Sequence, residues 1–270
     1  MGKFSGMLIC TDLDGTLLRN DKTISKENLD AIEYFKREGG SFTYITGRMP
    51  FTSSDIYNKI NPNAPFGCAN GGGVYDYPKQ DYIWTSTMPD GVNELVKYID
   101  EKFPNVGIQL NTFYKAYFCK ENSVMERFRR VTGLPNLVCH YNDVNEPLAK
   151  IIFGIASEDE MSQIIELLAA HPLADKFSFI RSERTLYEIL PKGIGKGTAI
   201  EKLAQHLNID KTIAIGDYNN DISMFEAAKI GIAVANACPE ALAAADYVTV
   251  SNEEHAIAKV IYDLEAGKYL

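Results

Sequence analysis

The clearest chemical signal in this sequence is a pair of carboxylates, Asp12 and Asp14, directly after the apolar segment Met7–Thr11. Gly15 lets the chain turn there, so both side chains can point beyond the end of the strand that this segment predicts. Carboxylates this close repel each other unless a cation or a shared proton relieves them. Mg2+ bound together with a phosphate is one natural partner, because this cation prefers a few carboxylates among other oxygen ligands.

Two further groups of residues could bind an anion. Thr46, Gly47 and Arg48 follow a β-type run, and a hydroxyl beside a glycine can donate to a phosphate oxygen, helped by free backbone N–H groups. Lys196 lies in a glycine-rich stretch ahead of a helical pattern and can supply a positive charge. Each group is weak evidence alone, since a strand-end loop and a solvated lysine have the same composition.

A second acidic group follows another apolar run late in the chain. Asp217 stands directly after the predicted strand 212–216 and would complete a metal site with the first two aspartates. Asn220 and Asp221 come next and could orient ligands or the lysine. A helix cap rich in Asn and Asp is the alternative interpretation of this group.

The elements that must position these groups alternate between apolar strands and amphipathic helices. A helix is expected over 25–38, because Ser25 suits an N-cap and Gly39 suits the position after the helix. Short strands that are apolar throughout indicate burial on both faces, as in a parallel sheet. The strands expected in this sheet are 7–11, 41–46, 66–69, 212–216, 230–234 and 247–250.

The middle of the chain has a different pattern. Its predicted strands are close enough to form hairpins, for example 177–181 and 185–190, and helices lie between them. This pattern predicts an α+β domain over residues 83–189, inserted into a catalytic core of residues 1–82 and 190–270. The fold class is therefore α/β, a parallel sheet flanked by helices with an inserted α+β domain.

Composition and charge exclude several classes of protein. The chain has 270 residues, of which 46% are hydrophobic, and a net charge of 27 − 36 = −9. An acidic chain is a poor binder of nucleic acid or of anionic membranes, and no apolar run is long enough for a membrane helix. Five scattered cysteines and the absence of a signal-like segment predict reduced thiols in a cytoplasmic protein. A monomer or a small homo-oligomer is expected.

Taken together, these groups resemble the haloacid dehalogenase (HAD) superfamily, and in detail its Cof-type phosphatases of subfamily IIB. The resemblance covers nearly the whole chain in family order, and His255 departs from it where such sequences often have glycine. It is carried by Asp12-Leu-Asp-Gly-Thr-Leu-Leu18, Thr46-Gly-Arg48, Asn70-Gly71, Lys196-Gly197, Gly216-Asp-Tyr-Asn-Asn-Asp221, Ala245-Asp-Tyr-Val-Thr249 and Ser251-Asn-Glu-Glu254. It implies a Rossmann-like core with a cap domain that determines substrate specificity.

The resemblance also implies roles for individual residues. Asp12 would be the nucleophile that forms an aspartyl-phosphate, and Asp14 would be the general acid and base, in surroundings that favour its protonated form more than those of Asp12. Mg2+ would be held by Asp12, the backbone carbonyl of Asp14, and Asp217. The non-transferring phosphoryl oxygens would be bound by Thr46 and Lys196. Further contacts to the substrate or phosphate would come from Gly47, Arg48, Asn70 and Asn220.

The leading hypothesis is therefore a Mg2+-dependent phosphatase for small phosphorylated metabolites such as sugar phosphates. A phosphosugar mutase is an alternative, because it shares the aspartyl nucleophile and the cap type. A non-catalytic protein that binds a phosphorylated metabolite is another, although such a protein would have no need to keep Asp14.

Overall fold

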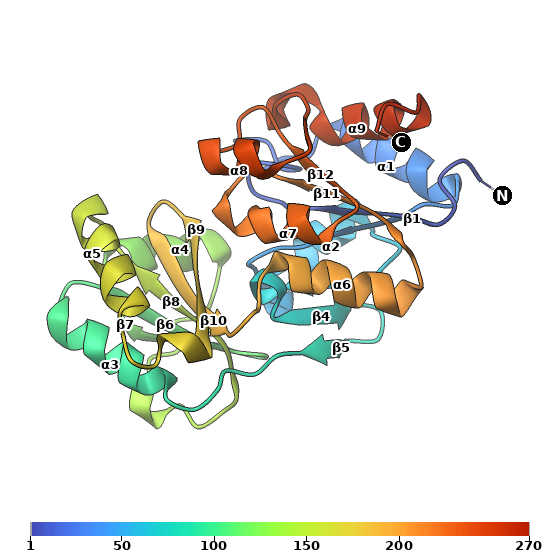
Figure 1. The fold of residues 1–270 in the computed structure, drawn as a ribbon. Helices are drawn as coiled ribbons and strands as arrows, with labels where there is room; N and C mark the ends of the chain where they lie inside the picture. The colour runs from blue at the N-terminus through green and yellow to red at the C-terminus, as the bar shows by residue number, and fades with distance from the viewer. Residues whose placement is uncertain (1, 270) are drawn as a thin grey trace. The chain divides into compact units, whose positions relative to one another are not determined.

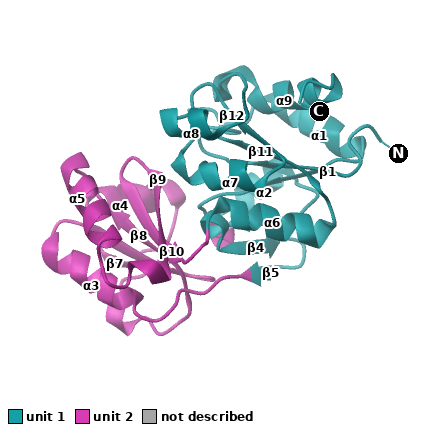
Figure 2. Cartoon of the chain, in the orientation of Figure 1, with its two compact units in different colours: residues 1–48, 53–84, 195–270 teal, residues 49–52, 85–194 magenta. Residues whose placement is uncertain are grey.

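The computed structural model describes residues 2–269 and divides the chain into two compact units (Figure 2). The first unit comprises the described residues of 1–48, 53–84 and 195–270, and the second comprises 49–52 and 85–194. The sequence predicted the inserted domain over 83–189. The structure thus divides the chain a few residues later at each end, and it adds the short segment 49–52 to the second unit.

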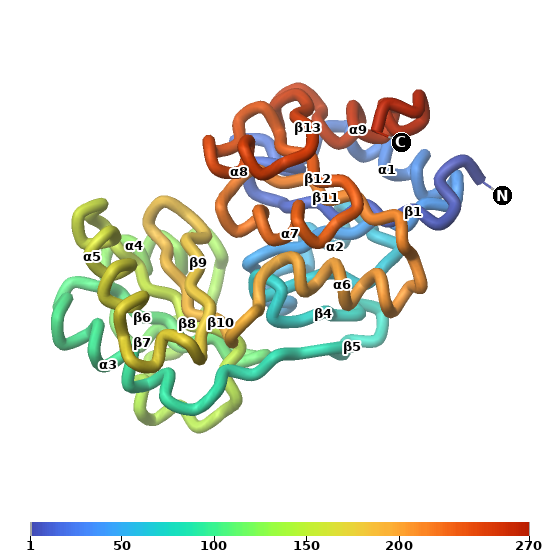
Figure 3. Tube along the Cα trace, in the orientation of Figure 1, coloured from blue at the N-terminus to red at the C-terminus, as the bar shows by residue number. Residues whose placement is uncertain are grey.

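The first unit contains a five-stranded sheet in which every neighbouring pair is parallel, with the order β13-β12-β11-β1-β2. Its central strands are buried along almost their whole length, which agrees with their apolar sequences. This order places the carboxyl ends of β1 and β11 side by side. The bounds are β1 (Met7–Thr11), β2 (Ser41–Tyr44), β11 (Lys211–Gly216), β12 (Ile230–Ala233) and β13 (Tyr247–Val248). The short edge strand β13 can be located in Figure 3.

Helices flank this sheet. In Figure 1, α1 and α9 lie side by side above the strands, and α6 and α7 lie below them. The predicted cap of the first helix is present, since the Ser25 side chain accepts a hydrogen bond from the backbone N–H of Asn28. The helices are α1 (Lys26–Arg37), α2 (Ser54–Ile60), α6 (Lys196–Leu207), α7 (Ile222–Ala227), α8 (Pro239–Ala244) and α9 (Ala256–Glu265).

The sequence predicted that residues 66–69 form a further strand of the parallel sheet, and this pairing is wrong. The strand β3 (Phe66–Cys68) pairs antiparallel with β4 (Gly73–Asp76), and β5 (Asp81–Thr85) completes a separate three-stranded sheet. Strand β3 contacts the chain after β2 through a single parallel bridge, between Ile45 and Gly67. The chain reverses between β3 and β4 because three successive residues, Ala69 to Gly71, have left-handed backbone angles.

The second unit is an antiparallel sheet with the strand order β7-β6-β8-β10-β9. Helices α3 (Val92–Lys102) and α5 (Glu158–Ala169) pack on one apolar face, and α4 (Ser123–Thr132) packs on the other. This unit has its own hydrophobic clusters, separate from that of the first unit. The strands are β6 (Gly107–Thr112), β7 (Ala116–Lys120), β8 (Leu148–Gly154), β9 (Phe177–Glu183) and β10 (Leu186–Pro191).

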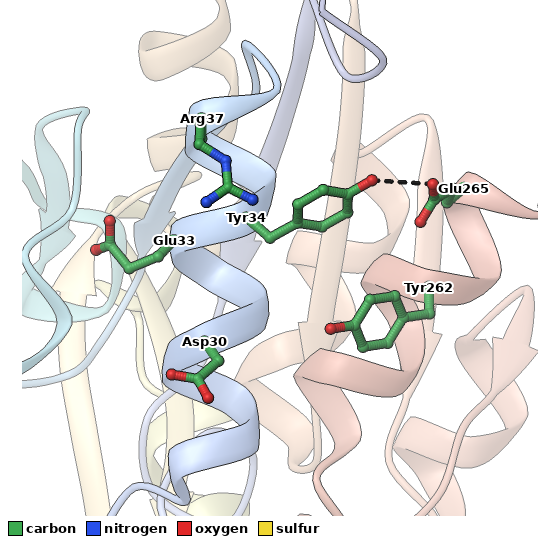
Figure 4. A pocket seen from close by; sticks show the side chains of 6 residues that line it. All are labelled: Asp30, Glu33, Tyr34, Arg37, Tyr262 and Glu265. Carbon is green, nitrogen blue, oxygen red and sulfur yellow. Dashed lines mark hydrogen bonds between the residues drawn. The ribbon is translucent and has the colours of Figure 1, made fainter.

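Two further features concern possible contacts with a membrane and with a ligand. Within residues 2–269, every helix is too short or too polar to cross a membrane. A groove of about 580 Å3 lies between α1 and α9, where the rings of Tyr34 and Tyr262 face each other (Figure 4). Its three carboxylates, on Asp30, Glu33 and Glu265, are each paired with a lysine outside the lining, so they are not free to bind a cation. None of the predicted site residues lines this groove.

Candidate active site at the carboxyl end of the parallel sheet

Asp12 is the first residue after β1 and is almost fully buried. Its backbone N–H donates to the carbonyl of Ile215, at 2.8 Å, so the residue continues the pairing of β1 with β11. The chain then turns at Gly15, whose φ is +89°. A Cβ atom at this position would lie 2.5 Å from Oδ2 of Asp217, so the close approach of the turn to that carboxylate requires glycine.

Lys196 is the first residue of α6 and its side chain is 1% exposed. Its ammonium lies 2.5 Å from Oδ1 of Asp12 and 2.5 Å from Oδ1 of Asp221. The other oxygen of Asp221 accepts hydrogen bonds from the backbone N–H groups of Asp217, at 2.8 Å, and Tyr218, at 3.0 Å. Asp221 therefore orients both the lysine, as the sequence suggested, and the loop after β11, which the sequence did not suggest.

Asp217 follows β11 and lies beside the turn that comes after β1. The hydroxyl of Thr16 donates to Oδ1 of Asp217, at 2.6 Å. Carboxylate oxygens of Asp12, Asp217 and Asp221 lie within 4.8 Å of one another. The structure thus brings together Asp12, Asp217, Asp221 and Lys196, although more than 180 residues separate the first from the last three.

The loops after β2 and β3 are bonded to each other. The backbone N–H of Asn70 donates to the carbonyl of Thr46, at 3.0 Å, and the N–H of Ala69 donates to that of Arg48, at 3.1 Å. The Asn220 amide donates to Oδ1 of Asn70, at 3.0 Å, and a Cβ on Gly47 would lie 3.1 Å from the Asn70 amide. Asn70 and Asn220 are buried, so in this structure they join the loop after β2 to the loop after β11.

Asp14 is held by two cations. The Arg48 guanidinium donates two hydrogen bonds to Oδ2, at 2.9 and 3.2 Å, and one to Oδ1, at 3.1 Å. The Lys22 ammonium donates to Oδ1 at 2.9 Å. Arg48, which the sequence suggested as a substrate ligand, therefore contacts the predicted acid–base residue itself.

Two of these partners had no assigned role from the sequence. Thr16 stands inside the motif after β1, and its hydroxyl two residues after Asp14 was the available signal. Lys22 lies eight residues after Asp14 with a left-handed φ of 65°. No spacing rule for a loop of this length connects it to the aspartate, so only the folded loop reveals the contact.

Three carboxylates lie close to one ammonium at this site, and their burial and charges shift the pKa values of Asp12, Asp217 and Lys196. Burial raises the pKa of Asp12 well above its ordinary value, and the negative charges of Asp221 and Asp217 add to this effect although Lys196 opposes it. Burial, and then the charge of Asp221, raise the pKa of Asp217 to about 7. Burial lowers the pKa of Lys196, but Asp12 and Asp221 outweigh it, so that the pKa is raised and the lysine stays protonated.

Asp14 behaves in the opposite way. Burial raises the pKa of its carboxyl, but Arg48 and Lys22 outweigh burial and lower it below the ordinary value. The resemblance seen in the sequence implied surroundings that favour protonated Asp14 more than protonated Asp12. In this structure the order is reversed, because Asp14 has two cationic partners while Asp12 shares one with Asp221.

The donor set can be tested for its fit to a metal ion. Asp12 and Asp217 supply hard carboxylate oxygens, and no hydrogen bond from residues 2–269 reaches Oδ2 of either side chain. Both oxygens of Asp221, in contrast, are already bonded to Lys196 and to backbone N–H groups. The excess negative charge and the oxygen-only ligands fit a hard divalent cation such as Mg2+, held by Asp12 and Asp217.

Comparison with known proteins identifies the family. Residues 9–261 match the model of the haloacid dehalogenase-like hydrolases, so the chain belongs to this family. The chain is 31% identical to the putative phosphatase YxeH of Bacillus subtilis, over 97% of this chain and 99% of that protein. It is 27% identical to the 5-amino-6-(5-phospho-D-ribitylamino)uracil phosphatase YitU of the same organism, over 94% and 96%.

The fold agrees with that family. The solved structure of BT4131, described as a HAD subclass IIB sugar phosphatase, superposes with a TM-score of 0.84 over 96% of this chain and 98% of that chain, at 23% identity. The α/β fold class, the predicted HAD family with its Cof-type members, and the enzyme class, a phosphatase, are thereby confirmed.

Proposed function

We propose that this protein is a Mg2+-dependent phosphatase that hydrolyses small phosphorylated metabolites through an aspartyl-phosphate on Asp12. The observation that carries the proposal is the Asp12 carboxylate, which lies at the end of β1, in contact with Lys196 and beside Asp217. A carboxylate in this position has a cation to orient it, and one of its oxygens accepts no hydrogen bond from residues 2–269. A binding protein has no comparable need for a nucleophile.

Asp12 acts first. One of its oxygens attacks phosphorus while the bond to the leaving oxygen breaks, and Asp14 donates a proton to that oxygen. Asp14 then takes a proton from the water that hydrolyses the aspartyl-phosphate, so phosphate leaves and Asp12 is restored. Lys196 and the Thr46 hydroxyl bind the non-transferring oxygens, with Gly47, Asn70 and Asn220 shaping that loop. Asp12, Asp217 and the backbone carbonyl of Asp14 would hold Mg2+, which would neutralise negative charge on the phosphoryl group.

The acid role of Asp14 requires a change in its surroundings. Arg48 and Lys22 favour its ionised form in this structure. We infer that the substrate draws at least the Arg48 guanidinium to its own anionic group, which weakens the bidentate pair with Asp14 and raises the carboxyl pKa. This interpretation keeps Arg48 as a substrate ligand, as the sequence suggested, and gives it a second partner in the free enzyme.

The substrate class is supported by the relatives. YitU is named for a phosphorylated ribityl compound and BT4131 is described as a sugar phosphatase. We infer a small phosphorylated metabolite of this polyhydroxylated kind for the present chain, and we assign substrate selection to the second unit. The five cysteines form no disulfide, which supports a cytoplasmic location.

The test is phosphate release from a panel of sugar phosphates, nucleotides and p-nitrophenyl phosphate, with Mg2+ and with a chelator. Asp12→Asn should abolish release, and Asp30→Asn, which changes an exposed aspartate on α1, should leave it unchanged. Release that is independent of Asp12 would refute the mechanism. A mutase would instead need a bisphosphate activator and release little phosphate, and a binding protein would bind a ligand without turnover.

A further inference from the structure

The turn that carries Asp14 is bonded to two asparagines from the opposite end of the chain. Asn252, which is 2% exposed, donates from Nδ2 to the carbonyl of Leu18, at 3.0 Å. Its backbone N–H donates to Oδ1 of Asn236, at 2.9 Å, and the Asn236 amide in turn donates to the carbonyl of Gly15, at 2.8 Å. The two asparagines thus bind the turn at both of its ends.

Asn252 is itself held in place. It begins a short 3-10 turn, in which the Ser251 hydroxyl donates to the Glu254 carboxylate at 2.7 Å. The neighbouring Glu253 accepts from the backbone N–H of Asn20, at 2.8 Å, so the same segment also fixes the loop that leads to Lys22. A buried amide with fixed neighbours has one available orientation, which suits it to define the position of another loop.

The turn between Gly15 and Leu18 also has side-chain contacts, because the Thr16 hydroxyl bonds Asp217 and Leu17 and Leu18 are buried in the core of the first unit. Within the turn, the N–H of Leu18 donates to the carbonyl of Leu13, at 2.8 Å, while that of Thr16 reaches the same carbonyl only at 3.4 Å. Yet the turn must place the Asp14 carboxyl and the Thr16 hydroxyl accurately, because an error of about 1 Å in a catalytic group can cost about 100-fold in rate. The bonds from the two asparagines to the backbone at both ends of the turn add to these contacts.

We propose that Asn252 and Asn236 are positioning residues that hold the turn after Asp14 in the geometry needed to protonate the leaving oxygen. The proposal rests on the acid–base role of Asp14 in the function proposed above. Neither asparagine contacts Asp12, Asp14, Asp217 or Lys196 through a hydrogen bond in the described chain. Their effect on the reaction is therefore exerted through the backbone carbonyls of Gly15 and Leu18.

The experiment compares Asn252→Ala with Asn28→Ala in the full-length protein with Mg2+. Asn28 is a matched control, because it is also buried in the first unit and also bonds one backbone group, the N–H of Ala258 at 3.0 Å, but lies on α1. Asn236→Ala is a second test variant. Because Asn236 is exposed, we expect this substitution to leave the folding of the protein intact. Thermal unfolding is measured for all three.

Two readouts distinguish positioning from general destabilisation. The first is kcat/KM for an alkyl phosphate against p-nitrophenyl phosphate, because only the alkyl leaving group depends strongly on protonation. We expect Asn252→Ala to lower kcat/KM about 10- to 100-fold more for the alkyl substrate, with KM nearly unchanged, and Asn236→Ala to do the same to a smaller extent. The second is hydrogen exchange of the amides in residues 13–20, which should become faster in both variants and stay unchanged in Asn28→Ala.

The outcomes separate this inference from the proposed function. Equal losses on both substrates, or unchanged exchange in residues 13–20, would overturn the positioning role even if the wild type is an active phosphatase. Wild-type protein that releases no phosphate from either substrate would refute the proposed function, and the role of Asp14 positioning with it. Selective loss on the alkyl phosphate together with faster exchange supports the inference.

Discussion

At the scale of single residues, the site depends on a balance between buried charges. Lys196 is the one cation that contacts Asp12 and Asp221 in the described chain, and all three side chains are 10% exposed or less. Removing one member of a buried ion cluster leaves an uncompensated charge, which costs more than the cluster contributes when complete. The same lysine therefore supports both the fold and the proposed reaction, and a pair of substitutions can separate the two contributions.

Replacing the lysine should affect activity and stability together. We expect Lys196→Met to lower kcat for phosphate release by about 10²- to 10³-fold, the usual effect of losing a donor to a developing negative charge. It should also lower the free energy of unfolding by roughly 3 to 5 kcal/mol at pH 7.5, measured by urea denaturation. Adding Asp221→Asn should restore part of the stability without restoring activity. Stability equal to that of the wild type would contradict the proposed charge balance.

The pKa of Asp217 predicts a pH dependence of stability. Because its folded pKa of about 7 lies above the ordinary value of 3.8, the folded state binds more protons than the unfolded state between about pH 4 and pH 7. Its contribution to stability therefore falls as the pH rises through this window in metal-free protein. Asp217→Asn should remove this decline and raise the unfolding free energy by roughly 1 to 2 kcal/mol at pH 8.

Stabilisation by Mg2+ should depend on pH in the opposite direction. A cation that requires ionised carboxylates competes with protons, so the increase in Tm on adding Mg2+ should be larger at pH 8 than at pH 5.5. Asp217→Asn should reduce that increase at pH 8. An increase that is the same at both pH values, or that survives the substitution in full, would argue against metal binding at this carboxylate.

At the scale of elements, the turn after β1 determines whether the aspartates from two strand ends can meet. Gly15 allows the turn to pass against the Asp217 carboxylate, and the Thr16 hydroxyl then bonds it. Alanine substitutions at two glycines, Gly15 and Gly6, can be compared to measure how much this close contact matters. Gly6 also has a positive φ, of +77°, but a Cβ there would have no atom within 4 Å.

Gly15→Ala should therefore cost more than Gly6→Ala. Both substitutions place a side chain in left-handed backbone, at about 1 to 3 kcal/mol each. Only Gly15→Ala adds a clash with Asp217, so we expect it to lose nearly all phosphatase activity, while Gly6→Ala keeps wild-type kcat and KM. Steady-state kinetics of the two variants, with Tm for each, provide the measurement, and equal activity in both would show that the turn tolerates displacement.

The elements also show how far the sequence could be interpreted. The strand β1 and helix α1 were predictable, because an apolar run, an N-cap serine and a terminal glycine are local signals. The pairing of β3 was predicted wrongly, because its reversal depends on left-handed Ala69 and Asn70, and alanine gives no local sign of that conformation. Strand pairing depends on distant partners that a single sequence does not display.

At the scale of the whole molecule, the chain forms two units that each have a buried ion pair. In the second unit, Lys150 lies 2.8 Å from Glu188, with side chains 4% and 3% exposed. The two units have separate hydrophobic clusters, so a lost charge in one should loosen that unit alone.

Hydrogen exchange can test this independence. Lys150→Met should speed exchange of amides in β6, β8 and β10 and leave those in β1 and β11 unchanged. Lys196→Met should do the reverse. If either substitution loosened both units to the same extent, the chain would behave as one cooperative body, and its stability would have to be described by a single transition.

Most of the candidate site was visible in the sequence because its residues stand at strand ends, where parallel strands bring them to one edge. What the sequence could not provide were the partners of those residues. Arg48 and Lys22 on Asp14, and Asn252 on the turn, come from loops whose paths are set by the complete fold. Arg48 and Lys22 lower the pKa of Asp14, and we propose that Asn252 aligns its turn, so the sequence predicts the type of residues at the site better than their protonation and alignment.

The strand order has a consequence for synthesis of the chain. β1 lies between β2 and β11, and its register pairs Met7 with Lys211. A ribosome working at about 5 to 20 residues per second needs roughly 10 to 40 s to make the 200 residues between Thr11 and Lys211. Throughout that interval one edge of an apolar strand has no native partner, and the second unit completes its own strands, with β10 ending at Pro191, shortly before Lys211 is made. The nascent chain therefore has to protect this edge, and Asp12 beside it has no lysine partner until Lys196 is made.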